Sequence, residues 1–255
     1  MIVPRYYEDL NMLHEGTMPD RSYYIPASAF MDRLDEHRED SDRILMLNGE
    51  WYFRYHESIY LLEEDFYGTE QDVEQYDKVA VPGVWQMYGY DTHQYTNIRY
   101  PFPFDPPYVP QDVPCGVYIR DLLYEKDPEA PKAYLDFEGV DSCFYLWLNG
   151  RYVGYSQVSH STSEFDVTPY LKEGRNRLVL LVLKWCDGSY LEDQDKFRMS
   201  GIFRDVYLLK RPAQVVFDYF VQTRLEDSGQ ARVTVDLTYL LQAVPTRIKI
   251  LDQTG

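Results

Sequence analysis

Carboxylates are concentrated in one stretch of the sequence, residues 185–201 (WCDGSYLEDQDKFRMSG). Clustered Asp and Glu oxygens suit hard cations such as Na⁺, Mg²⁺ or Ca²⁺, and they can also bind hydroxyl groups or act as acid and base. The spacing of an EF-hand calcium loop is absent. Such a charge run is ordinarily a solvated loop, but the interleaved Trp185, Tyr190 and Phe197 favour a site for a polar, ring-shaped ligand.

A second candidate group lies upstream, where residues 82–114 are rich in Pro and aromatic residues. Because Pro removes a ladder donor, we expect loops here, and ordered loops that bury aromatic rings often form sites. Asn97 offers both a donor and an acceptor, which suits adjacent hydroxyl groups. A turn Asn before a Pro-rich loop is an equally good explanation.

Other chemistries have no support in the sequence. The five His are scattered, and the three Cys (Cys115, Cys143 and Cys186) are too far apart for a disulfide framework or a Cys-rich zinc site, so we expect them to pack as small apolar residues. There is no CxxC, HExxH, GxSxG or P-loop pattern. A formal net charge of −17 makes nucleic acid and anionic membranes poor partners.

The amino terminus does not resemble a signal peptide, and the longest aliphatic run, residues 178–183, is far shorter than the roughly 20 residues that cross a bilayer. We therefore expect a cytoplasmic protein with no membrane partner.

The candidate residues must be positioned by secondary structure, and the hydrophobic and turn patterns of the sequence predict β-strands. Residues 1–45 have no strong period and are expected to be a surface arm, with a possible short helix at 29–38. Trp51, Phe53 and Tyr55 alternate on one face. Asn149-Gly150 between two β-type runs predicts a tight hairpin, and residues 178–183 predict a buried strand. Residues 46–211 are thus predicted to be an all-β sandwich or jelly roll.

The pattern breaks at residues 210–212 (KRP). Three more strands are predicted after it, at residues 215–221, 231–239 and 246–251. Three strands are too few for an immunoglobulin-like sandwich, which needs about seven. Residues 212–255 are therefore predicted to be part of a domain that is cut partway through, rather than a small extra sheet.

Several blocks resemble the amino-terminal region of glycoside hydrolase family 2 β-galactosidases, in family order. The last is the most specific, and it resembles the long β-galactosidases more than the β-glucuronidases. The blocks are residues 47–51, 81–91, 95–101, 137–142, 147–157, 163–166, 187–195 and 198–206.

The resemblance implies a sugar-binding jelly-roll domain followed by an incomplete immunoglobulin-like domain. The parent enzyme would hydrolyse terminal, non-reducing β-D-galactose residues with retention, using two Glu residues on a TIM barrel that this chain lacks. We therefore assign no catalytic residue, do not promote Glu192 or Asp193 to that role, and expect the isolated chain to be inactive. Its expected partners are a β-galactoside and the missing barrel, in a parent that is a homo-oligomer.

Two residues match the family's contributors to the substrate site. Asn97 resembles the Asn that reaches into the galactose subsite, and Asp195 resembles the Asp that binds the O6 side of galactose and ligates Na⁺. Asp187 and Gln157 resemble ligands of an outlying structural Mg²⁺. Residues 8–11 (EDLN) depart from the arm sequence that contributes to that site in the family, which weakens the expectation of Mg²⁺. We expect no tightly bound metal in the isolated chain.

Two other functions compete with an enzyme fragment. A free-standing carbohydrate-binding module would need a solvent-facing platform of aromatic rings. A structural or partner subunit would need a large exposed apolar patch.

Overall fold

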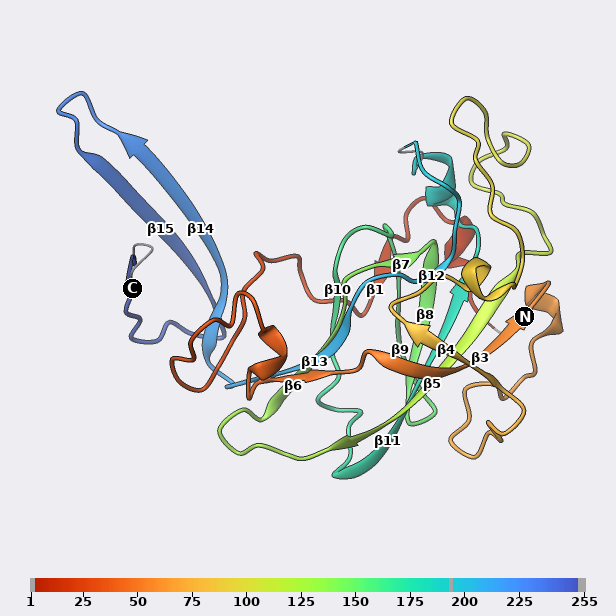
Figure 1. The fold of residues 1–255 in the computed structure, drawn as a ribbon, viewed down its shortest axis with the longest axis horizontal. Coiled ribbons are helices and arrows are strands. Elements are labelled where there is room, and N and C mark those ends of the chain that lie inside the picture. Colours follow the sequence, from red (N-terminus) through yellow and green to blue (C-terminus); the bar gives the residue numbers. More distant parts are fainter. Residues whose placement is uncertain (1–2, 193–194, 252–255) are drawn as a thin grey trace.

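Residues 3–192 and 195–251 are described by a computed structural model, in which two antiparallel sheets face each other (Figure 1). The larger sheet has seven strands in the order β1-β9-β8-β11-β5-β3-β4, and the smaller has four in the order β10-β6-β13-β2. Their strands are β1 (His14–Glu15), β2 (Ile44–Met46), β3 (Gly49–His56), β4 (Asp77–Val81), β5 (Cys115–Tyr124), β6 (Lys132–Phe137), β8 (Cys143–Leu148), β9 (Arg151–Gln157), β10 (Ser163–Asp166), β11 (Gly174–Leu183) and β13 (Val206–Arg211).

The remaining elements are short or lie outside this sandwich. β7 (Val140–Asp141) pairs with β12 (Gly201–Ile202), and β14 (Val215–Leu225) pairs with β15 (Ala231–Leu240) in a two-stranded ribbon that projects from the sandwich (Figure 1). The helices are 3₁₀ turns: η1 (Tyr6–Glu8), η2 (Arg38–Asp40), η3 (Ile59–Leu61), η4 (Trp85–Tyr88) and η5 (Asp187–Tyr190). None of the helices in the described residues is long and apolar enough to span a membrane.

The main core lies between the two sheets and confirms the all-β jelly-roll prediction. Trp51 and Phe53 of β3 point into it with alternate residues of β11, and Phe165 and Leu135 reach it from the smaller sheet. The opposite face of the larger sheet is buried as well, under the arm and the long loops. Because both faces are covered, β11 is apolar at successive positions, and residues 178–183 are fully buried.

The Asn149-Gly150 turn joins β8 and β9 as predicted. Both residues have positive φ, 54° and 74°, which is what a two-residue hairpin turn requires. The three Cys are free and buried, also as predicted. Two predicted elements are absent: residues 29–38 form turns, with only η2 beginning at Arg38, and residues 246–251 form no strand.

The arm is more than a surface segment. Val3 and Tyr7 are buried beneath the larger sheet, and β1 adds to its edge beside β9. Met18 then packs on the outer face of the smaller sheet, against a cluster formed by Tyr134, Tyr207 and Leu209. The arm therefore wraps both sheets, although no apolar period in its sequence indicates it.

Candidate functional site

Asn97 and Asp195 are brought together at one end of the sandwich. Asn97 lies in the loop after η4 and Asp195 in the loop after η5. The two loops are joined by an isolated antiparallel bridge between Gln94 and Arg198, whose backbone N donates to the Gln94 carbonyl at 2.6 Å. This bridge holds the loops side by side a few residues from each candidate.

A third residue, Tyr95, lies between the two predicted ones. The Asn97 amide Nδ2 donates to Asp195 Oδ1 at 3.2 Å and to the Tyr95 hydroxyl at 2.9 Å. The Tyr95 hydroxyl in turn donates to Asp195 Oδ1. The sequence analysis did not single out Tyr95, although it stands in the same family block as Asn97, residues 95–101. No other pattern in that loop marks it.

The group is open to solvent and flanked by aromatic rings. Tyr95 is 53% exposed, and its ring centroid lies 5.7 Å from that of Phe197, which also contacts His93 edge-on at 5.0 Å. A carboxylate, an amide and apolar ring faces are the groups that recognise a hydroxylated ring. Two buried acceptors in the same loop, Gln94 Oε1 and Thr96 Oγ1, have no hydrogen-bond partner in the part of the chain described.

Neighbouring charges are engaged in holding these loops. Lys196 donates to Asp141 at 2.7 Å, and the Glu192 carboxylate accepts from the Ser159 backbone N and hydroxyl, both at 2.9 Å. Glu192 thus joins the loop after η5 to the segment that follows β9. Asp193 lies outside the described residues.

The predicted Mg²⁺ ligands also lie together, in a different and buried place. Asp187 of η5 and Gln157 of β9 are each 3% exposed, and Tyr155 donates to Gln157 Oε1 at 3.2 Å. Burial raises the pKa of Asp187, the neighbouring Asp9 carboxylate raises it further, and the Gln157 amide opposes the shift. Asp9 belongs to the arm, so the arm does reach this place despite its departure from the family sequence.

Two carboxylates and an amide oxygen are hard donors suited to Mg²⁺, and a cation would relieve the buried charge of Asp187. Among the described residues, no group of three or more His, Cys, Asp or Glu side chains is arranged to hold a metal. The donor set therefore fits the ion in chemistry but is incomplete in number.

These features define a β-sandwich domain that carries a polar, aromatic-flanked rim on its end loops. The profile described as "Glycosyl hydrolases family 2, sugar binding domain" matches residues 44–212. The chain belongs to this family.

The relatives are β-galactosidases by name. The chain is 48% identical to the β-galactosidase of Actinobacillus pleuropneumoniae over all of its own length, and 44% identical to that of Staphylococcus xylosus over 96% of it. It spans about a quarter of each relative, 25% and 24%. A Ruminococcus gnavus β-glucuronidase solved with uronic deoxynojirimycin matches 78% of this chain and 34% of its own, with a TM-score of 0.60 at 15% identity, which shows the fold alone.

Proposed function

We propose that this chain is the amino-terminal, sugar-binding part of a retaining β-galactosidase, and that it supplies the rim of the galactose subsite. The observation that carries the proposal is the direct contact of Asn97 with Asp195 across 98 positions of sequence, in an exposed loop cluster. Its support is the family, the identity to named β-galactosidases and the match of both residues to that family's motifs.

In this proposal Asn97 and Asp195 bind hydroxyl groups of the sugar, and Tyr95 orients them. Asp195 would also help to hold Na⁺, which supplies positive charge beside the sugar hydroxyl. Retaining hydrolysis needs two carboxylates about 5 Å apart, a nucleophile and an acid/base. Both belong to the barrel of the parent, so this chain's residues bind and orient the substrate.

A structural Mg²⁺ is proposed at the second place. Asp187, Gln157 and Asp9 would hold it, with its remaining ligands from water or backbone, and it would tie the arm to η5. Because the isolated site has few donors, we expect weak binding in the isolated chain.

The remainder of the parent is the proposed partner of the exposed apolar side chains around the rim. They lie on the loops that flank the site, where an uncovered apolar surface is costly. The most exposed are Met87, Ile98, Phe104, Tyr108 and Leu191. Residues 212–255, whose described part holds the two-stranded sheet β14-β15, are proposed to be the start of the immunoglobulin-like domain, and the parent is proposed to be a cytoplasmic homo-oligomer.

A free-standing carbohydrate-binding module is the second candidate. The observation in its favour is an exposed pair of rings, Tyr100 and Phe104, whose centroids are 4.8 Å apart with a 31° tilt. Such a pair could form a platform for a sugar. The two functions differ in the affinity that the chain has by itself.

Titration calorimetry of the isolated chain with galactose separates them. A rim supplied by one of several domains predicts a millimolar or weaker dissociation constant, about −4 kcal/mol, and no turnover of a chromogenic galactoside. A micromolar constant that Tyr100→Ala abolishes would establish the module instead. Turnover by the chain that Asp195→Ala removes would contradict the assignment of catalysis to the barrel.

A further inference from the structure

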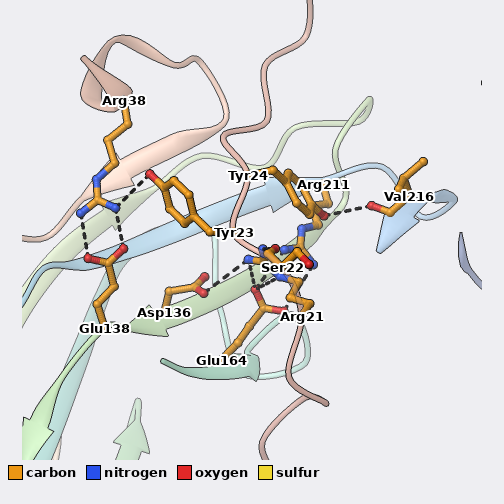
Figure 2. A network of polar contacts seen from close by, with 10 residues as sticks. All are labelled: Arg21, Ser22, Tyr23, Tyr24, Arg38, Asp136, Glu138, Glu164, Arg211 and Val216. Atoms are coloured by element: carbon orange, nitrogen blue, oxygen red, sulfur yellow. Dashed lines mark hydrogen bonds and ion pairs between the residues drawn. The ribbon is translucent and has the colours of Figure 1, made fainter. Parts of the chain in front are cut away.

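Residues 21–24 of the arm lie between the smaller sheet and the ribbon and contact both (Figure 2). On the sheet side the contact is ionic. Arg21 donates to Glu164 Oε2 through Nη2 at 2.6 Å and Nε at 3.1 Å. Arg211 donates to both oxygens of the same carboxylate, at 3.3 and 3.0 Å. One glutamate on β10 therefore holds both the arm and the last residue of β13.

This network is buried. Arg21, Glu164 and Arg211 are 9%, 5% and 0% exposed in their side chains. The Arg211 guanidinium lies over the Tyr134 ring at 4.6 Å and faces Tyr24 of the arm at 5.5 Å. Charges that are paired and removed from water fix geometry more strictly than surface pairs, because leaving one partner unpaired is costly.

On the ribbon side the contact is made by hydrogen bonds to β14. The Ser22 backbone N donates to Asp218 Oδ1 and its hydroxyl to the Tyr219 carbonyl, both at 2.8 Å. The Tyr24 hydroxyl donates to the Val216 carbonyl at 2.9 Å, and the Tyr219 hydroxyl donates back to the Tyr23 carbonyl at 2.8 Å.

The sequence of β14 is arranged for this contact. The register of the ribbon shifts between Val216 and Asp218, so the intervening Phe217 has no partner in β15. Phe217 is buried, with its ring 5.9 Å from the Arg211 guanidinium. The bulge thus directs Phe217 toward the ion network while Asp218 meets Ser22, as bulges commonly re-aim side chains.

We infer that residues 21–24 form a strap that fixes the ribbon on the sandwich. The chain between the two units is short, since β13 ends at Arg211 and β14 begins at Val215. A short connection alone leaves a two-stranded ribbon free to pivot, because relative motion of adjoining units is the default when their interface is small. The strap removes that freedom by bonding the ribbon to the sheet from a distant part of the sequence. The inference does not depend on the proposed sugar-binding function.

The test measures ribbon mobility in the full 255-residue chain. The strap variant combines Ser22→Ala, Tyr24→Phe and Asp218→Ala. It removes three of the four hydrogen bonds between residues 22–24 and β14, and it leaves the ion pairs of Glu164 in place. Spin labels at Thr234→Cys in the ribbon and Glu125→Cys in the sandwich report their separation by pulsed electron resonance. The native Cys are buried and do not compete for label.

We expect the width of the distance distribution to increase by at least about twofold in the strap variant. Its melting temperature should stay within about 2 °C of that of the 255-residue chain without these substitutions. Gln222→Ala is the matched control, because it removes a ribbon hydrogen bond to Asp236 that does not involve the arm, and it should leave the width unchanged. An unchanged width in the strap variant would overturn the inference. So would unfolding of the sandwich with the ribbon, since residues 21–24 would then be part of one cooperative core.

Discussion

Replacing Glu164 with Ala should be among the most destabilising single changes of a charged residue in this fold. The substitution removes the carboxylate that pairs with both Arg21 and Arg211, and leaves two guanidinium groups at 9% and 0% exposure. Breaking a buried pair by removing one partner costs about 3–5 kcal/mol. Asp136 remains 3.6 Å from Arg21 and can take over part of the pairing, so we expect the lower end of that range.

Urea denaturation followed by tryptophan fluorescence measures this loss directly. The four Trp, at positions 51, 85, 147 and 185, are all buried in the sandwich and report its unfolding. Glu63→Ala is the control, because its ion pair with Arg54 is largely exposed and should be worth less than about 1 kcal/mol. A double variant, Glu164→Leu with Arg211→Met, should recover part of the loss, since it leaves only the Arg21 guanidinium without its Glu164 partner, and Asp136 lies 3.6 Å from it.

The result that would refute this reasoning is a loss for Glu164→Ala no larger than that of Glu63→Ala. It would mean that water reaches the two guanidinium groups once the carboxylate is gone, and that the network is not truly buried.

Three further predictions follow from particular contacts. Burial, and then the nearby Glu164 carboxylate, raise the pKa of Asp136 well above its ordinary value. The free energy of unfolding of the wild-type chain should therefore fall as the pH rises from the unfolded-state pKa of about 4 toward the folded-state pKa, and urea titrations across pH should show no such loss for Asp136→Asn. An equal pH dependence in the variant would contradict this prediction. Tyr95→Phe should leave the melting temperature unchanged but lower kcat/KM of the proposed parent β-galactosidase by roughly tenfold or more, because it removes the hydrogen bond to the Asp195 carboxylate, and an unaltered kcat/KM would exclude an orienting role. Gly154→Ala would drive its Cβ into the Glu15 carbonyl and should cost about 1–3 kcal/mol and speed hydrogen exchange in β1; unchanged exchange would show that the arm can shift without loss.

Local sequence patterns predict the sandwich well, because its strands and turns are marked by residues that lie next to one another in the sequence. The alternation of Trp51 and Phe53, the Asn149-Gly150 turn and the apolar run of β11 each depend on a few neighbouring residues, and each has the predicted structure. The strand predicted at residues 246–251 is absent for a different reason. A strand needs a hydrogen-bonded neighbour as well as β-forming residues, and β15 pairs only with β14 in the described part of the chain.

The arm shows where such patterns fail. Its residues have no apolar period, because it lies against different surfaces in succession rather than forming one amphipathic element. Arg211 lies where the strand pattern breaks, and nothing in its neighbouring sequence indicates that its side chain is fully buried. Its burial depends on Glu164 and on aromatic rings from the arm and β14, which a single window of sequence does not contain.

In the candidate site, some features can be predicted from local sequence and others depend on residues far apart in the chain. The family motifs identify Asn97 and Asp195 individually, but neither residue's surroundings in sequence indicate the other. Their contact depends on the Gln94–Arg198 bridge and on Tyr95, whose hydroxyl joins the two side chains. Motif matching therefore finds the two residues proposed to touch the ligand, whereas a residue that would orient them becomes visible only when the loops are placed side by side. Because Tyr95 is such a residue and is itself half exposed, its substitution tests the arrangement of the site without disturbing the core.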